Sequence, residues 1–337
     1  MELKIYDFEL PLRHTFRISR GSSDTQDSII VELTVDGISG FGEATTNYYY
    51  GVTKDSLRES LLSVSDYVKE HTFSEPTKLW SELKNKFDLE PFALCAIDLA
   101  AYDLWGKIND VPTYQLLGLS LDTCPDSDYT IGIDTIEKMV EKLNEFSGWS
   151  IYKIKLGTKE DLEIMKELRR HTDAIFRIDA NCGWTAEETI TNAVVLKDLG
   201  AEFIEQPLKA DDWHGMKAVH EQCCLPVIAD ESCVVESDVE KCAGIFDGVN
   251  IKLTKCGGIT PALRMIEKAR SLNLKTMVGC MVESTVGISG IAQILPLLDY
   301  VDMDGAVLIS KDIASGVKVI KGKVEYSSEN GSGIKLL

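Results

Sequence analysis

Positive charge is scarce in this chain of 337 residues, in which 35 Lys and Arg stand against 54 Asp and Glu. The net charge of −19 argues against nucleic acid or an anionic membrane as a partner, because both would repel a strongly acidic protein. Long hydrophobic runs are also missing, since none reaches the roughly 18 residues that a membrane-spanning helix needs. The sequence therefore predicts a soluble protein with neither of these partners.

The cysteines also lack the spacing that indicates a disulfide framework or a metal-binding motif. The nine cysteines are an odd number, and no two of them form a C-x-x-C pair. The opening residues MELKIYDFEL lack the pattern of a secretory signal peptide. Because unpaired cysteines are typical of compartments that keep thiols reduced, we expect a cytoplasmic protein. The sequence leaves open whether the chain forms a homo-oligomer.

Three acidic residues stand at nearly equal intervals, each at the C-terminal end of a short apolar run. They are Asp179 in FRIDAN, Glu205 in FIEQP and Asp230 in PVIADES, about one strand plus one helix apart. In a (β/α) barrel, residues one unit apart at strand ends point to the same mouth. Three carboxylates gathered there repel one another unless a cation lies between them. The spacing therefore predicts a hard divalent cation, Mg²⁺, with one ion per chain.

The same interval continues on both sides of the acidic residues. Lys155 ends the run IYKIK before them, and Lys252 ends the run GVNIK after them. Three further apolar segments, TIGI, VGCM and DYVDM, fall at neighbouring intervals and bring the number of expected strands to eight. The stretches 159–171, 186–199 and 260–272 have the apolar spacing of helices. We therefore expect an α/β barrel domain over residues 126–309.

The first 125 residues do not follow this interval. Segments 2–10 and 28–35 alternate as antiparallel strands do, and the stretch from 53 to 108 has helical spacing. We expect a separate α+β domain over residues 1–125. We expect a linker with two prolines over 112–128, and a C-terminal segment from about 310 to 337 that returns to the first domain.

The segment 13–27, RHTFRISRGSSDTQD, is a polar connection between two expected strands. It holds three arginines, Arg13, Arg17 and Arg20, and several hydroxyl side chains. Two interpretations stay open, a solvated hairpin connection and a mobile lid over a site.

The lysines near the acidic residues suggest acid–base chemistry. Lys153 and Lys155 alternate on one expected strand, so both point into the barrel, and Lys252 lies on the opposite side of the mouth. We expect each lysine, and the metal, to lower the pKa of the other lysine, because nearby positive charge favours a neutral amine. Two bases that face one carbon from two sides can invert it by removing a proton and returning another. Lys255 competes for the role of second base, but we favour Lys252 and expect Lys255 at the surface of a loop.

These segments closely resemble the enolase superfamily, in its muconate-lactonizing-enzyme subgroup, over nearly the whole chain. The matching pieces are KIK, RIDAN, EQP, ADES and NIKLTKCGG, and GFGEA with the helix ending in DLWGK resembles the capping domain of that family. The resemblance implies a modified TIM barrel of (β/α)7β form, with an N-terminal α+β capping domain. It also implies that Lys155 and Lys252 are the bases, that the three acidic residues are the metal ligands, and that Lys153 lies near the substrate carboxylate. Sites of this superfamily pair a Lys or His base with Mg²⁺ and an enediolate.

The reaction within the subgroup depends on the segment DMDG. Asp302 and Asp304 alternate there and resemble the Asp-x-Asp motif of dipeptide epimerases, which holds the free α-ammonium of a dipeptide. The resemblance thus implies epimerisation at the α-carbon of the C-terminal residue by two-base 1,1-proton transfer through an enediolate. The substrate is expected to be a small dipeptide, L-Ala-D/L-Glu or a broader L-Ala-X, with a role in peptidoglycan peptide metabolism.

Further residues of the dipeptide site follow from the same resemblance. Thr130, Cys280 and Val282 are expected to line it, and relatives often have serine where Cys280 stands. Arg20 matches an arginine that some Glu-specific relatives place in the polar segment, while others place theirs one position later. The second residue of the dipeptide therefore stays open, as does a supporting role for Glu283.

Two alternatives remain at this stage. An o-succinylbenzoate synthase or cycloisomerase would share the metal and base residues, although Asp302 and Asp304 would repel the anionic substrates of a cycloisomerase. A catalytically silent barrel that binds a small acid is the alternative from another class, and the intact set of charged residues argues against it.

Overall fold

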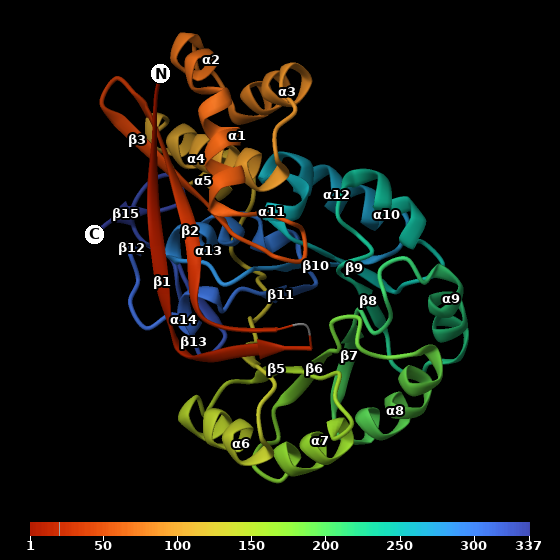
Figure 1. The fold of residues 1–337 in the computed structure, drawn as a ribbon. Helices are drawn as coiled ribbons and strands as arrows, with labels where there is room; N and C mark the ends of the chain where they lie inside the picture. Colours follow the sequence, from red (N-terminus) through yellow and green to blue (C-terminus); the bar gives the residue numbers. More distant parts are fainter. Residues whose placement is uncertain (20) are drawn as a thin grey trace.

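Eight parallel strands form the central sheet of the computed structural model, which describes residues 1–19 and 21–337 (Figure 1). Each strand pairs with its neighbours in the chain, in the order β11-β10-β9-β8-β7-β6-β5-β4. The strands are β4 (Tyr129–Ile131), β5 (Ile151–Lys155), β6 (Ile175–Asp179), β7 (Ala201–Glu205), β8 (Val227–Ala229), β9 (Gly248–Ile251), β10 (Lys275–Gly279) and β11 (Tyr300–Asp302). A further bridge joins Ser127 to Val301, so the sheet nearly closes. The expected α/β barrel is confirmed.

Helices alternate with these strands and form the outer layer of the barrel (Figure 1). They are α6 (Ile136–Glu145), α7 (Asp161–Arg169), α8 (Ala186–Asp198), α9 (Trp213–Gln222), α10 (Glu236–Cys242), α11 (Leu253–Cys256), α12 (Ile259–Ser271), α13 (Thr285–Ala292), the 3₁₀ turn η1 (Leu295–Leu297) and α14 (Gly305–Leu308). The helical spacing at 159–171, 186–199 and 260–272 corresponds to α7, α8 and α12. Because every strand leads into a loop on the same side of the sheet, the strand ends share one mouth.

The N-terminal part is an antiparallel sheet covered by helices. Its elements are β1 (Glu2–Ile18), β2 (Gly21–Val35), β3 (Ile38–Thr45), α1 (Lys54–Ser63), α2 (Ser65–Glu70), α3 (Pro76–Lys86), α4 (Pro91–Ile108) and α5 (Thr113–Leu116). Helix α4 approaches β3 closely, because a Cβ added at Gly42 would lie 2.0 Å from the backbone oxygen of Ala96. The glycines in GFGEA therefore permit this helix–sheet contact.

Helix α4 also joins this part to the barrel. Its residues Cys95, Leu99 and Tyr102 belong to the hydrophobic core of the barrel, whereas other residues of α4 pack against β2, β3 and α1. The buried Asp98 of α4 accepts hydrogen bonds from the backbone N and Oγ1 of Thr260 in α12, at 2.9 and 2.7 Å. The N-terminus of a barrel helix is thus held by a carboxylate of the N-terminal part.

The described residues of the polar segment 13–27 belong to strands, so the two strands extend beyond the expected segments 2–10 and 28–35 into the hairpin connection. Strands β1 and β2 continue their pairing from Phe16–Ser23 to Ile18–Gly21, after a shift of register that follows Pro11. Backbone pairing satisfies the polar groups of the chain even where both faces are exposed. The end of this hairpin reaches the barrel mouth, where the backbone oxygen of Arg17 accepts from Ile133 N at 2.8 Å.

The last residues contact both parts of the molecule. Strands β13 (Lys318–Ile320) and β14 (Lys323–Glu325) form a hairpin against the barrel, while β12 (Ala314–Ser315) pairs with β15 (Lys335–Leu336). Ser332 N donates to Asp103 of α4 at 2.8 Å. The domain boundaries at residues 125 and 309 stay predictions. Among the helices that the structure describes, none is long and apolar enough to cross a membrane.

Candidate active site

The three acidic residues lie side by side at the barrel mouth. Asp179 ends β6 and pairs in register with Glu205 at the end of β7, and Asp230 directly follows β8. All three side chains are buried. Their spacing in the sequence thus becomes a row of carboxylates at adjacent strand ends.

Lys153 lies among these carboxylates. Its Nζ is 3.1 Å from Asp179 Oδ2, 2.7 Å from Glu205 Oε2 and 2.7 Å from Asp302 Oδ2. Burial alone would lower the pKa of Lys153, but the charges of Asp302, Glu205 and Asp179 outweigh it and hold the pKa well above its usual value. Lys153 is therefore a fixed buried cation.

The two expected bases flank the acidic row. Lys155 Nζ lies 2.6 Å from Asp179 Oδ2, and Lys252 Nζ lies 2.9 Å from Asp230 Oδ2. Lys155 ends β5, and Lys252 follows β9, so three strands separate them around the mouth. Both line a cavity of about 650 Å³, which gives a small molecule room between them.

The charges of the protein itself raise the pKa values of Lys153 and Lys252, which is opposite to the lowering expected from neighbouring lysines. Burial would lower the pKa of Lys252, but the adjacent Asp230 outweighs burial and raises it. Conversely, burial would raise the pKa of Asp230, and the charges of Lys252 and Lys255 hold it well below its usual value. The reason is that Lys153 and Lys252 contact carboxylates at 2.7 and 2.9 Å, and this attraction outweighs burial in both and the repulsion of Lys252 by Lys153.

Lys255 is buried, which corrects its expected surface position. Its Nζ donates to Asp230 Oδ1 and to the backbone oxygen of Asp230, both at 2.6 Å. It also donates to the backbone oxygens of Cys233 and Asn250, at 2.9 and 3.1 Å. Lys255 lies in the turn of α11, which begins right after Lys252, and residues three apart on a helical turn share a face. The two lysines therefore reach the two oxygens of one carboxylate.

Sequence reasoning missed two amides that hold the acidic row. Asn250 Nδ2 donates to Glu205 Oε1 at 2.7 Å, and Gln206 Oε1 accepts from the backbone N of Asp230 at 3.0 Å. Asn250 stands two residues before Lys252 and thus faces the same side of β9. The alternation of residues in GVNIK could therefore have indicated that Asn250 faces the site.

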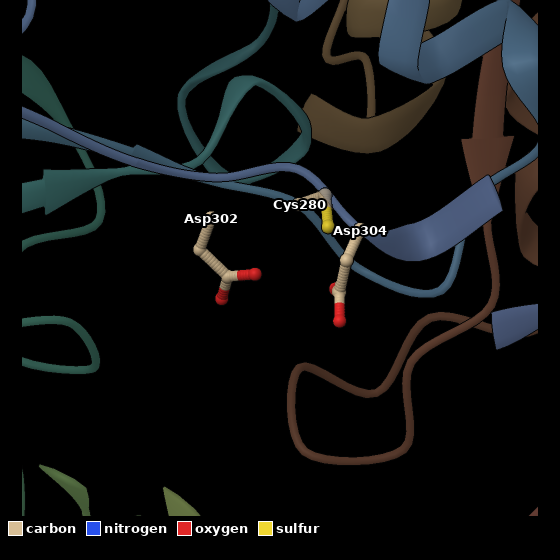
Figure 2. A group of neighbouring side chains, drawn as sticks. All are labelled: Cys280, Asp302 and Asp304. Carbon is tan, nitrogen blue, oxygen red and sulfur yellow. The ribbon is translucent and has the colours of Figure 1, made fainter. Parts of the chain in front are cut away.

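A second cluster lies across the mouth. Cys280 directly follows β10, Asp302 ends β11, and Asp304 precedes α14; Figure 2 shows the three side chains pointing toward the same space. Their ligand atoms all lie within 4.8 Å of one another. Asp304 Oδ2 accepts from Thr130 N at 2.6 Å, and Asp302 Oδ1 is buried and has no hydrogen-bond partner among the described residues. Burial and the neighbouring Asp302 raise the pKa of Asp304 to about 8.

The remaining expected residues are Thr130, Val282, Arg20 and Glu283. Thr130 and Val282 line the same cavity as the bases, as the resemblance implied. Arg20 lies outside the described residues. The described part of the cavity wall near the hairpin end is formed by Phe16, Ile18 and neighbouring small polar residues.

Glu283 is buried, which raises its pKa to about 8, and its side chain accepts a hydrogen bond from Met281 N at 2.8 Å.

The acidic row suits a hard cation. Asp179, Glu205 and Asp230 offer only carboxylate oxygens, the donors that Mg²⁺ prefers. Lys153 already places one positive group within 3.1 Å of both Asp179 and Glu205. These three residues would hold the ion, and its chemistry would be to stabilise negative charge on a bound carboxylate.

The comparisons with known proteins agree along the whole chain. Residues 1–118 match the family model described as the mandelate racemase/muconate lactonizing enzyme N-terminal domain, and residues 135–337 match the model described as enolase C-terminal domain-like. A protein of Maribacter sp. named L-Ala-D/L-amino acid epimerase is 55% identical over 337 residues, which cover 100% of this chain and 99% of that protein. A protein of the same name from Flavobacterium johnsoniae is also 55% identical, with 100% of both chains covered.

Solved structures show the same similarity. A substrate-liganded complex of the L-Ala-D/L-Glu epimerase from Bacillus subtilis has a TM-score of 0.94 at 26% identity, covering 99% of this chain and 98% of that one. A dipeptide epimerase from Enterococcus faecalis, complexed with Mg and L-Leu-L-Tyr, has a TM-score of 0.92 at 30% identity, with the same coverage.

Proposed function

This chain belongs to the mandelate racemase/muconate lactonizing enzyme family of the enolase superfamily, and on that basis we propose that it is a Mg²⁺-dependent dipeptide epimerase. It inverts the α-carbon of the C-terminal residue of an L-Ala-X dipeptide. One observation carries the proposal: Lys155 and Lys252 contact the two ends of a row of three buried carboxylates and line one cavity. The relatives at 55% identity are named epimerases, which favours this function over a lyase or a silent barrel.

The two lysines move the proton. The neutral amine of one lysine takes the α-proton, and the electron pair left on the carbon spreads into the substrate carboxylate as an enediolate. The ammonium of the other lysine returns a proton to the opposite face, which inverts the carbon. Asp179, Glu205 and Asp230 would hold a Mg²⁺ ion, which would stabilise the negative charge on that carboxylate. Lys153 adds a fixed positive charge on the same side.

The substrate ammonium binds at the second cluster. Asp302 Oδ1 is a buried acceptor without a described partner, and an ammonium group would satisfy it. Asp304 is held in place by its hydrogen bond from Thr130 N. The two aspartates lie at the end of β11 and in the loop after it, two strands from Lys252 in the sheet order, and they line the same cavity as the two bases.

The enzyme accepts a broad range of second residues in the dipeptide and prefers those with apolar side chains. Among the described residues that line the cavity, the only cations are Lys155 and Lys252, which serve proton transfer, and Arg20, the expected partner of a Glu side chain, lies outside the described residues. Phe16, Ile18 and Tyr50 supply apolar and aromatic surface near the hairpin end. The names of the Maribacter and Flavobacterium relatives, which specify amino acid and not Glu, agree with this.

The substrate also places the enzyme after a hydrolytic step. A dipeptide with a free α-ammonium is the product of a peptidase, and peptides of the cell wall are a source that contains alternating L and D residues. A cytoplasmic location is supported by the nine cysteines, all of which are free.

A D₂O exchange screen tests the proposal. Mixed dipeptides, with L-Ala or another L-residue at the first position, are incubated with the protein and Mg²⁺ in D₂O. The products are analysed by mass spectrometry and chiral chromatography. We expect one deuterium at the α-carbon of the C-terminal residue, together with the second epimer, and no exchange after chelation of the metal. Absence of exchange with every dipeptide, from a folded protein that binds Mg²⁺, would refute the function.

A further inference from the structure

The ammonium cluster contains a group that ammonium binding does not require. Two carboxylates suffice to hold an ammonium, yet Cys280 places a thiol beside Asp302 and Asp304, with all three ligand atoms within 4.8 Å of one another (Figure 2). Cys280 N also donates to the backbone oxygen of Asp302 at 2.8 Å, which fixes β10 and β11 at this point. The backbone pairing therefore holds the thiol beside the two carboxylates.

We propose that Cys280, Asp302 and Asp304 form a second cation site, which binds a borderline-soft divalent ion of the Zn²⁺ type. One sulfur and two carboxylate oxygens are ligands that Zn²⁺ accepts, with a water molecule at the fourth position. The acidic row has oxygen donors only and keeps its preference for Mg²⁺. The chain thus carries two cation sites that differ in softness.

The unpartnered oxygen of Asp302 is a second observation that supports this assignment, and it is the same oxygen that the substrate ammonium would use. Asp302 Oδ2 already contacts Lys153 at 2.7 Å, and Oδ1 is buried without a partner among the described residues. A carboxylate can bridge a lysine on one oxygen and a metal on the other. Asp304 is similarly anchored through Oδ2 by Thr130 N, so both carboxylates are oriented before an ion arrives.

The geometry needs only a small adjustment. Zn²⁺ binds sulfur at about 2.3 Å and carboxylate oxygen at about 2.0–2.2 Å, so its ligands lie roughly 3.5 Å apart in a tetrahedron. Ligand atoms now within 4.8 Å reach that separation through side-chain rotation. On binding, the thiol of Cys280 loses its proton to solvent as the sulfur–metal bond forms.

The site has a consequence that rests on the proposed function. The ion would occupy the place of the dipeptide ammonium, because both use Asp302 and Asp304. Zn²⁺ is thus a competitive inhibitor with respect to dipeptide, and added Mg²⁺ does not relieve the inhibition. Serine in place of Cys280 would remove the soft ligand and with it the preference for Zn²⁺ over Mg²⁺.

Cobalt is the probe for the test, because thiolate-bound Co²⁺ has a sulfur-to-metal charge-transfer band that carboxylate-bound Co²⁺ lacks. The full chain, with excess Mg²⁺ on the acidic row, is titrated with Co²⁺ under anaerobic conditions. We expect a band that saturates at one Co²⁺ per chain and is lost on addition of Zn²⁺. The Cys280→Ser variant should lack the band, whereas Cys224→Ser, which removes an exposed cysteine, should keep it.

The outcomes separate the cation site from the proposed function. Absence of the band in the parent protein, or its persistence in Cys280→Ser, overturns the site even if the protein epimerises dipeptides. A second variant, Asp304→Asn, keeps the thiol and should weaken Co²⁺ binding at least 10-fold, which covers the case that Cys280→Ser misfolds. Loss of the band on addition of a dipeptide substrate supports the shared position, and unchanged Co²⁺ binding with bound dipeptide overturns it.

Discussion

Lys255 Nζ lies 2.6 Å from Asp230 Oδ1, while Lys252 Nζ lies 2.9 Å from Asp230 Oδ2, so one buried carboxylate is shared by two lysines. The two amines are not equivalent. Lys255 makes three further hydrogen bonds to backbone oxygens, whereas Lys252 lines the cavity. This arrangement assigns Lys252 to chemistry and Lys255 to holding Asp230 in position.

Replacement of either base should abolish epimerisation. For Lys155→Ala and Lys252→Ala we expect a loss of at least about 100-fold in kcat, the lower end of a general acid–base contribution. One variant should still exchange the α-proton of a single epimer, because the other lysine remains. Chiral chromatography and deuterium incorporation measure the two effects. Lys138→Ala, which changes an exposed lysine of α6, is the control, and normal epimerisation by both base variants would contradict the two-base mechanism.

Replacement of Lys255 should affect stability and metal binding before chemistry. Lys255→Met removes four hydrogen bonds made by a buried amine, including the one to Asp230 Oδ1. We expect a loss of roughly 1–3 kcal/mol in the free energy of unfolding and weaker Mg²⁺ binding. Urea unfolding and calorimetric Mg²⁺ titration provide the measurements. Lys252→Met is the matched comparison, and equal effects on stability in the two variants would remove the distinction between them.

Asp302 should matter chiefly for substrate binding. Removing one charged partner of a buried ammonium costs roughly 2–5 kcal/mol, so Asp302→Asn should raise KM by about 30-fold or more. The ratio of KM values for an N-acetylated and a free dipeptide reports this contact, because acetylation removes the ammonium charge. That ratio should be large in the parent protein and fall in the variant. A variant with an unchanged ratio would place the ammonium elsewhere.

The repeating elements of this fold were predictable from the sequence, because apolar runs at a constant interval are typical of strands and helices that alternate around a parallel sheet. The acidic row followed for the same reason, since each carboxylate ends a run. Lys255 was not predictable from that pattern. The short turn of α11 brings the side chain of Lys255 to the same carboxylate that Lys252 contacts. A helix of four residues is too short to show helical periodicity in the sequence. The pairing of segment 13–27 was missed because its backbone hydrogen bonds, and not its side chains, extend the hairpin.

The direction in which the protein's own charges shift the lysine pKa values was not predictable, for a related reason. The sequence showed lysines near one another but not which carboxylate each would contact, and contact distance decides the sign of the shift. Lys153 illustrates this, since three carboxylates lie within 3.1 Å of its Nζ. A pKa at such a site depends on the tertiary fold.

The contact between Asp98 and Thr260 should make the stability of the protein depend on pH. Burial raises the pKa of Asp98 to about 7, although hydrogen bonds from Thr260 oppose the shift. The unfolded chain loses this proton near pH 4, so from there up to about pH 7 the folded state binds more protons and its stability falls as the pH rises. Below the unfolded pKa the contribution is fully present, and above about pH 7 it is lost.

Asp98→Asn isolates this contribution, because asparagine keeps an acceptor for Thr260 but does not titrate. A shift of about three pKa units is worth roughly 4 kcal/mol at most. The free energy of unfolding of the parent protein, minus that of the variant, should therefore fall between pH 4.5 and 7 and stay level from 7 to 8.5. Urea unfolding at each pH gives both values, and shifts common to the two proteins, such as that of Glu43, cancel in the difference. A difference that stays constant from pH 4.5 to 8.5 would mean that Asp98 is ionised throughout in the folded protein, so that the Thr260 hydrogen bonds outweigh burial at this junction of α4 and α12.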